Sequence, residues 1–280
     1  MNPDLLRAAV AQMCSGPDLQ VNLAQAEQLM TEARSAGADL LLLPENFAVF
    51  GRKDLPLLAE PADGVGAIGQ FLSDAARRYQ LWLVAGTAPY AAAASDGTPA
   101  AAGKVYPGCS VWNPQGELVA RYDKCHLFDV DVGDTVGRYR ESDSFAPGDR
   151  PVVVATPWCQ IGLSICYDLR FPEYFRQLAQ LGASLITVPS AFTYRTGEAH
   201  WEVLLRARAI ENQCFVLAAN QGGQHDAQRH TWGHSCLIDP WGKVLACRME
   251  EGPGVVVADL DFAALREIRR QMPVFQHRRF

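Results

Sequence analysis

The sequence predicts an α/β fold in which helices cover a central sheet. Strand-length apolar runs alternate with segments whose apolar residues recur at helical spacing. Several of these runs are apolar at every position, which is typical of strands buried on both faces. The chain has 280 residues, 49% of them hydrophobic, and no shift in composition marks an internal boundary. We therefore expect a single domain over residues 1–280.

The first third of the chain contains strands that alternate with helices. The expected strands are 6–13, 40–46 and 81–90, and the expected helices are 21–38 and 66–80. In the first helix Leu23, Ala26 and Met30 recur at helical spacing, and Gly37 stands near its end. Residues 91–104 are small, polar and rich in Gly and Pro, which predicts a surface loop inside a hairpin-like excursion.

The remaining elements repeat this alternation and add two hairpins. The hairpins turn at Asn113-Pro114-Gln115-Gly116 and at Asp239-Pro240-Trp241-Gly242. The expected strands are two within 152–166, then 184–190 and 214–221, and the expected helices are 171–183, 200–213 and 261–272. Segment 127–149 is long and polar, so it is either disordered or functional, and its position between two motifs favours function. The tail 273–280 suits docking onto a partner or another subunit.

Composition excludes several classes of partner. The formal charge is −6, with 25 Lys and Arg against 31 Asp and Glu, and no long basic run points to nucleic acid. The N-terminus lacks a signal-peptide pattern, and no apolar stretch is long enough to span a bilayer. We expect a soluble, cytoplasmic protein with no membrane partner and eight reduced cysteines. No C-x-x-C pair occurs, so neither a metal nor a cofactor is needed to explain the sequence.

Cys166 is a candidate nucleophile because of where it stands in the predicted fold. It ends the apolar strand IGLSIC, and Pro172 suits the first turn of the helix that follows. Such a strand-to-helix turn exposes a side chain, leaves the N–H of Tyr167 free to hold an oxyanion, and favours a thiolate at the helix terminus. The alternative is an inert cysteine buried in the core.

Two charged residues follow other strands. Glu45 ends the apolar run LLLLPE, where a carboxylate is costly unless it reaches solvent or a partner. It is a candidate general base, or else a loop residue or half of an ion pair. Lys124 follows a strand within RYDKCHLF, and an ammonium there can stabilise an oxyanion. Taken alone, a lysine at this position is also consistent with a solvated surface charge.

The segments LLLPEN, YDKCHLFD and GLSICYDLRFPE, in this order and spacing, resemble the three motifs of the nitrilase superfamily. The resemblance covers nearly the whole chain and implies a single carbon–nitrogen hydrolase domain, a four-layer αββα sandwich that commonly forms a homodimer. It implies that Cys166 is the nucleophile, Glu45 the general base and Lys124 the oxyanion-stabilising residue. Glu141 resembles the second carboxylate, which positions the lysine and the substrate.

The same resemblance implies an amide hydrolase and a substrate class. Glu45 would take the proton of Cys166, the thiolate would attack the amide carbon, and water would release the acid from a thioester. The stretches PSAFTYRTGEAHWEVLLRARAIENQ and WGHSCLIDPWG resemble the amidase branch that contains ω-amidases and deaminated glutathione amidases, most closely the latter. This implies cleavage of deaminated glutathione to 2-oxoglutarate and cysteinylglycine. The alternatives are 2-oxoglutaramate or an N-carbamoyl amine as substrate.

A small-molecule amide that carries a carboxylate needs a cationic partner in the site. Arg170 can bind such a carboxylate, with a salt bridge to Asp168 or Glu173 as the alternative. Phe192 and Thr196 resemble residues that line the acyl pocket, although they also fit a role in loop packing. With Tyr167, these residues are the expected substrate-binding set.

Three other interpretations remain open from the sequence. A Cys-His hydrolase would use His126, His200 or His234 as the base. A peroxide-reducing thiol protein would need a resolving partner such as Cys159. A non-catalytic interaction protein on the same fold has no physical need for a reactive thiol beside two charges.

Overall fold

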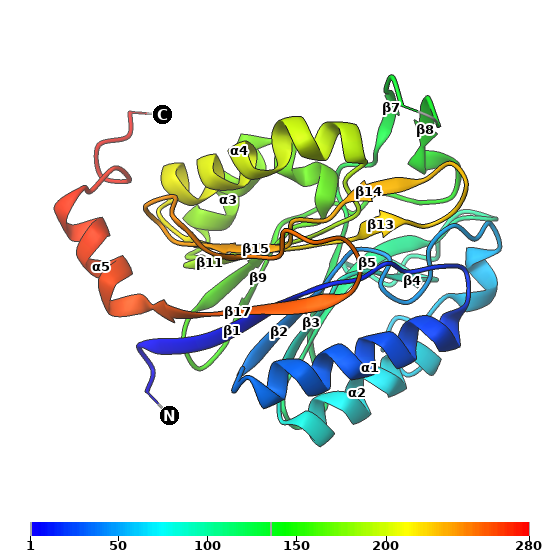
Figure 1. The fold of residues 1–280 in the computed structure, drawn as a ribbon, viewed down its shortest axis with the longest axis horizontal. Coiled ribbons are helices and arrows are strands. Elements are labelled where there is room, and N and C mark those ends of the chain that lie inside the picture. Colours follow the sequence, from blue (N-terminus) through cyan, green and yellow to red (C-terminus); the bar gives the residue numbers. More distant parts are fainter. Residues whose placement is uncertain (1, 135, 280) are drawn as a thin grey trace.

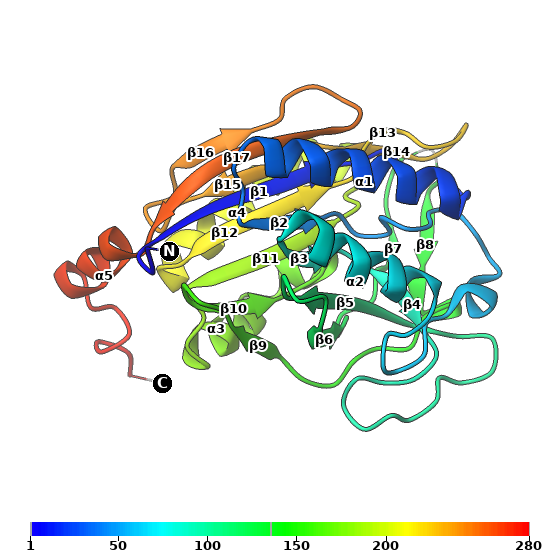
Figure 2. The same ribbon diagram turned by 90° about the horizontal axis from the view of Figure 1, so that it is seen from below.

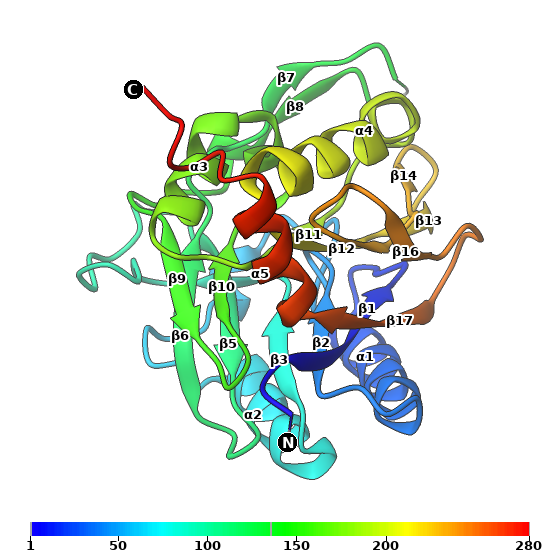
Figure 3. The same ribbon diagram turned by 90° about the vertical axis from the view of Figure 1, so that its left-hand side faces the viewer.

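The computed structural model describes residues 2–134 and 136–279 and has four layers (Figures 1 and 3). Two sheets pack face to face, with strands β1 and β2 of one sheet against β12 of the other. Helices α1 (Leu19–Ser35) and α2 (Ala67–Tyr79) cover the outer face of the first sheet. Helices α3 (Pro172–Gln180) and α4 (Tyr194–Asn212) cover the outer face of the second. The αββα sandwich is confirmed.

The first sheet is built mainly from the N-terminal half of the chain. Its strand order is β17-β1-β2-β3-β5-β4, and β6 pairs with β5. The bounds are β1 Leu5–Gln12, β2 Leu40–Leu43, β3 Trp82–Ala85, β4 Ala88–Tyr90, β5 Tyr106–Trp112, β6 Leu118–Asp123 and β17 Gly254–Asp261. Strands β1, β2 and β3 are parallel, and every residue of β2 is buried, as its uninterrupted apolar sequence predicts.

The second sheet has the order β16-β15-β12-β11-β10-β9. The bounds are β9 Val152–Ala155, β10 Gln160–Leu163, β11 Leu185–Ser190, β12 Phe215–Asn220, β15 Cys236–Ile238 and β16 Val244–Cys247. Strands β10, β11 and β12 are parallel, while β15 and β16 form the predicted hairpin at the edge. Buried residues of both sheets and of α3 and α4 form one continuous hydrophobic cluster.

Strand β17 and the start of helix α4 differ from the sequence-based expectation. Strand β17 was not predicted, yet it pairs antiparallel with β1 along its full length, from Leu5 opposite Asp261 to Gln12 opposite Gly254. Helix α4 begins at Tyr194 rather than at His200. Its first turn contains Gly197, which breaks the helical pattern in the sequence. In the structure a Cβ at this position would lie 2.2 Å from the Cβ of Trp232, so close packing explains the glycine.

Segment 127–149 is structured on both sides of Thr135, which lies outside the described residues. Strands β7 (Asp129–Asp131) and β8 (Arg138–Arg140) form a short antiparallel hairpin, and a 3-10 turn at Glu141–Asp143 follows. The hairpin projects beyond the sandwich at the same end as a second one, made of β13 (Gly222–Gln224) and β14 (His230–Trp232) (Figure 1).

Helix α5 (Phe262–Gln271) lies at the opposite end of the molecule and leads into the C-terminal tail (Figures 1 and 2). The tail turns back onto its own chain, where the ring of Phe275 lies 5.1 Å from the guanidinium of Arg176 on α3. Docking of 273–280 onto another subunit stays a prediction, and Phe280 lies outside the described residues. Within the described ranges, the structure has no helix long and apolar enough to cross a membrane.

Candidate active site

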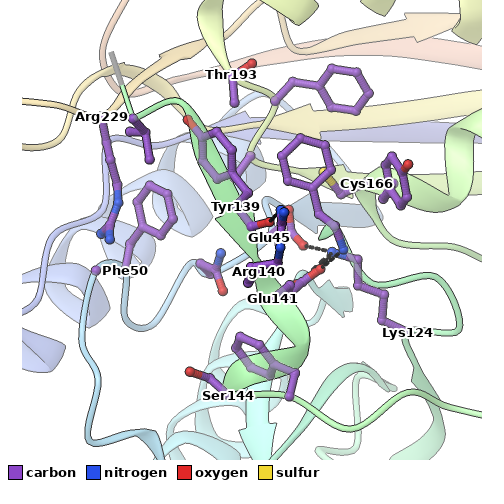
Figure 4. Close-up of a pocket in the computed structure, with 18 of the residues that line it drawn as sticks. Glu45, Phe50, Lys124, Tyr139, Arg140, Glu141, Ser144, Cys166, Thr193 and Arg229 are labelled. Atoms are coloured by element: carbon purple, nitrogen blue, oxygen red, sulfur yellow. Dashed lines mark hydrogen bonds and ion pairs between the residues drawn. The ribbon is translucent and has the colours of Figure 1, made fainter. Parts of the chain in front are cut away.

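Glu45, Lys124 and Cys166 lie together in one pocket (Figure 4). Each stands one to three residues after a strand: β2 ends at Leu43, β6 at Asp123 and β10 at Leu163. Open α/β sheets place their sites beyond the carboxyl ends of strands, because side chains from neighbouring strands converge there. All three residues line a cavity of about 310 Å³, together with every other predicted site residue: Glu141, Tyr167, Arg170, Phe192 and Thr196.

A buried ion cluster occupies the floor of this cavity. The Lys124 ammonium lies 2.8 Å from Glu45 Oε1 and 2.8 Å from both carboxylate oxygens of Glu141. Lys124 is 1% exposed and Glu45 is 4% exposed. Burying charges is costly unless they are paired, so the three side chains hold one another in place. The backbone N–H of Phe128 also donates to Glu141 Oε2 at 2.6 Å.

Cys166 stands on a tight turn between β10 and α3. Its φ of 46° is in the left-handed region, and Cys166 is the first residue of a 3-10 turn over Cys166–Arg170. Such backbone strain is uncommon outside glycine and is typical of functional sites. Glu45 and Lys124 line the same cavity as Cys166, and both charges act on its thiol. The thiol therefore lies in the same cavity as the residue expected to act as its base and within reach of its charge.

The electrostatics differ from the sequence-based expectation of a thiolate. Burial and the negative charge of Glu45 raise the pKa of Cys166 well above its ordinary value, and the opposing effects of Lys124 and the Ala191 N–H are smaller. Burial alone would lower the pKa of Lys124, but Glu141 and Glu45 raise it well above its usual range. Burial also raises the pKa of Glu141. The resting site holds a neutral thiol beside a cationic lysine.

This arrangement predicts the pH dependence of Cys166 alkylation in the free enzyme. Only the thiolate reacts, and a raised pKa means that a smaller fraction is ionised at any given pH. The rate of iodoacetamide labelling at Cys166 should rise about tenfold per pH unit from neutrality through pH 9. The measurement is peptide mass spectrometry after timed labelling. A rate that levels off below pH 8 would instead indicate a preformed thiolate.

Asp168 connects the Lys124 segment to the Cys166 turn, a role that the sequence did not suggest. It is fully buried and accepts the N–H of Ile165 at 2.8 Å and the hydroxyl of Tyr122 at 2.7 Å. It also contacts the His126 ring at 2.7 Å. One carboxylate thus fixes residues on both sides of the lysine and the residue before the nucleophile. Its position two residues after Cys166 was the only available signal.

Hydrogen bonds and close packing from neighbouring segments fix the turn that carries Glu45. Gln221, which follows β12, donates through Nε2 to the carbonyl oxygen of Glu45 at 2.9 Å. Asn46 has a φ of 57°, and its N–H donates to the Thr87 hydroxyl at 2.8 Å. Gly86 is required beside this turn, because its φ is 45° and a Cβ would lie 1.9 Å from the carbonyl oxygen of Pro44. The backbone of Glu45 is therefore held at several points.

The predicted substrate-binding residues form one wall of the cavity. The Arg170 guanidinium lies 5.5 Å from the centre of the Phe192 ring, and its Nη1 is 3.3 Å from His200 Nδ1. The alternative in which Asp168 binds Arg170 loses support, because the contacts of Asp168 are those with Tyr122, His126 and Ile165. Thr196 pairs with the Thr193 hydroxyl at 2.9 Å.

Much of the cavity lining comes from residues that no sequence motif marks. Among the residues that were not singled out from the sequence are Phe50, Phe128, Tyr139, Thr193 and Arg229. Figure 4 shows that Arg229 and Phe50 lie together, and the guanidinium is 5.7 Å from the ring centre. The position of segment 127–149 favours a function. The segment has no regular spacing of apolar residues, however, so its sequence does not indicate which side chains face the site.

The open alternatives lose support. The cavity lining contains Cys166 and Glu45 but not His126, His200 or His234. Cys159 precedes β10 and Cys166 follows it, so extended chain separates them by roughly 20 Å. This separation is too large for a disulfide. In residues 2–134 and 136–279, no group of three or more His, Cys, Asp or Glu side chains could hold a metal ion.

Comparison with known proteins decides the family. The sequence profile described as "Carbon-nitrogen hydrolase" matches residues 7–270. The chain belongs to this family of carbon–nitrogen hydrolases. The nitrilase-type resemblance and the expectation of an amidase are confirmed.

Individual relatives of this carbon–nitrogen hydrolase agree with the assignment. The protein named deaminated glutathione amidase from Yersinia enterocolitica is 44% identical over 97% of this chain and 92% of its own length. The crystal structure of the C. elegans NitFhit protein has a TM-score of 0.86 at 36% identity, and the match covers 100% of this chain and 66% of that one. Saccharomyces cerevisiae Nit3, described as a member of branch 10 of the nitrilase superfamily, has a TM-score of 0.84 at 30% identity, over 99% and 97% of the two chains.

Proposed function

We propose that this carbon–nitrogen hydrolase cleaves the amide bond of deaminated glutathione, giving 2-oxoglutarate and cysteinylglycine. The observation that carries the proposal is that Cys166, Glu45 and Lys124 line one cavity, where the Lys124 ammonium contacts the Glu45 carboxylate and the charge of Glu45 acts on the thiol. The name of the Yersinia relative supports the substrate. Arg170 on the cavity wall supplies a cation for the carboxylate of the 2-oxo acid.

The reaction follows from the positions of these groups. Glu45 accepts the Cys166 proton as the sulfur attacks the amide carbon, which compensates for the raised pKa of the thiol. Lys124 stabilises the tetrahedral oxyanion, together with the N–H of Tyr167. Glu45 returns the proton to the departing amine. A thioester between the acyl group and Cys166 remains. Glu45 then activates a water that releases the acid, while Glu141 keeps Lys124 charged and in place.

The substrate assignment is tested by comparing kcat/KM for deaminated glutathione, 2-oxoglutaramate and an N-carbamoyl amine. The highest value should be found for deaminated glutathione. A higher value for 2-oxoglutaramate would identify an ω-amidase instead, and a preference for the N-carbamoyl amine would contradict the 2-oxo acid as the acyl group. Absence of turnover with all three would overturn the proposed substrate class.

Arg170→Gln is expected to weaken substrate binding. Losing a charge-assisted hydrogen bond costs about 1.5–3 kcal/mol, which corresponds to roughly a 10- to 100-fold lower kcat/KM. The loss should appear mainly in KM, because the carboxylate is remote from the reacting atoms and binds equally in the ground and transition states. Steady-state kinetics of the variant check this. A fall in kcat alone would contradict the role.

We also propose that the chain forms a single domain over 1–280, assembles as a homodimer and acts in the cytoplasm. Val203, Ile210 and Trp241 support an interface, since they are exposed by 69%, 51% and 65% on or beside α4. The eight cysteines are all free, which fits a reducing compartment. Light scattering coupled to size exclusion at several concentrations tests the dimer, and a constant monomer mass would overturn it.

A further inference from the structure

A second pair of thiols lies away from the catalytic cavity, on the β15–β16 hairpin. Cys236 is the first residue of β15 and Cys247 the last of β16, and the two are direct cross-strand partners. Neither lines the catalytic cavity. The hairpin runs along the edge of the second sheet, and its strand β15 lies above β17 and β1 in Figure 1.

The hydrogen-bond pattern identifies the type of this cross-strand pair. The N–H of Arg248, one residue after Cys247, donates to the carbonyl oxygen of Ser235, one residue before Cys236, at 2.9 Å. A bond between these flanking residues marks a non-hydrogen-bonded pair, in which the Cα atoms are about 4.5 Å apart and the side chains are closest. Disulfides span Cα separations of roughly 4.4–6.8 Å, so the strands can accept a bridge without moving.

The two thiols belong to cross-strand partners and shift each other's pKa in opposite directions. The interaction between them lowers the pKa of Cys247 and raises that of Cys236, although burial and the charges of Glu202 and Glu250 oppose the effect at Cys247. Among the chain's cysteines, all of which the structure describes, Cys247 is the one whose pKa is lowered.

The two cysteines differ in solvent exposure, and this difference sets the order in which they can react. Cys247 is half-buried and close enough to Glu202 and Glu250 to be influenced by their charges, whereas Cys236 is 2% exposed. A disulfide from solution can therefore reach Cys247 first. The buried Cys236 can react only afterwards, with the mixed disulfide that has formed on Cys247. Attack by an ionised, accessible thiol followed by resolution from a neighbouring buried thiol is the usual course of thiol–disulfide exchange.

We propose that Cys236 and Cys247 are a redox-active dithiol that reacts with low-molecular-weight disulfides, such as glutathione disulfide, to form a reversible cross-strand disulfide. The Cys247 thiolate attacks one sulfur of glutathione disulfide, forms a mixed disulfide and releases one glutathione. Cys236 then loses its proton, attacks the Cys247 sulfur and releases the second glutathione. Two protein thiols are oxidised and one glutathione disulfide is reduced to two glutathiones.

The test is incubation of the full-length protein with glutathione disulfide, followed by blocking of free thiols and non-reducing tryptic mapping. Lys243 lies between the two cysteines, so trypsin places them on separate peptides. The expected product is one disulfide that joins these peptides and disappears with dithiothreitol. The proposal would be overturned if glutathione disulfide left both cysteines unmodified under conditions in which an alkylating reagent does modify Cys247. A persistent mixed disulfide in the wild-type protein would also overturn it.

Single substitutions separate the two steps. Cys236→Ser should accumulate a mixed disulfide at Cys247, because nothing resolves it, whereas Cys247→Ser should leave Cys236 unmodified. Cys125→Ser is a matched control, since Cys125 is also half-buried but burial raises its pKa to about 11. This control should form the wild-type crosslink. Glutathione attached to Cys236 in Cys247→Ser would contradict the assigned order.

Discussion

Replacing Cys166 by Ala should abolish amide hydrolysis, with a fall in kcat of at least about 10⁴-fold, because it removes the atom that bonds to the substrate. The cavity and the ion cluster of Glu45, Lys124 and Glu141 do not need the sulfur for their own contacts. The variant should therefore still bind substrate. Steady-state kinetics and calorimetric titration with substrate measure the two effects separately.

Cys159→Ala is the matched control for this substitution. Cys159 lies before the same strand, outside the cavity, and its backbone and side chain contact Thr156 instead. Its replacement should leave kcat essentially unchanged. If Cys166→Ala kept wild-type turnover, or if Cys159→Ala lost it, the assignment of the nucleophile would be wrong.

Glu45→Gln should produce the second largest loss, about 10²- to 10⁴-fold in kcat, because the raised pKa of Cys166 makes attack dependent on a base. The amide is similar in size, so the contact with Lys124 can persist while the proton acceptor is lost. Stopped-flow measurement of amine release isolates acylation from thioester hydrolysis. Both steps should slow, since Glu45 serves in each.

The outcome for Glu45→Gln also discriminates against a histidine base. Acylation close to the wild-type rate would show that another group takes the thiol proton. His126 contacts Asp168, and His200 contacts Arg170, so neither is arranged as the partner of Cys166. Glu141→Gln provides the contrast: it should slow the reaction less, because Glu141 contacts Lys124 and not the thiol.

The motif residues could be predicted because each follows a strand with an unambiguous apolar pattern. Strand β2 is buried along its whole length, and Glu45 follows its end. The thiol of Cys166 likewise follows the end of strand β10. Parallel pairing within each sheet and the packing of the two sheets then bring these ends together. The order of layers came from the resemblance, since periodicity alone does not specify how two sheets pack.

Other features depend on contacts between residues far apart in the sequence. Strand β17 exists because it completes the sheet beside β1, and its half-buried residues give no distinctive pattern. Asp168 acts through hydrogen bonds to Tyr122 and His126, which no local pattern reveals. The pKa of Cys166 was also predicted in the wrong direction, because burial and Glu45 outweigh any effect of the short 3-10 turn.

Acid quenching during turnover of deaminated glutathione, followed by peptide mass spectrometry, tests the thioester on Cys166 most directly. The tryptic peptide that ends at Arg170 contains both Cys159 and Cys166, so fragmentation must locate the modified sulfur. The account predicts a 2-oxoglutaryl group on Cys166, absent from Cys166→Ala. Rapid turnover with the acyl group on another residue, or with Cys166 unmodified while amine is released in a burst, would contradict it.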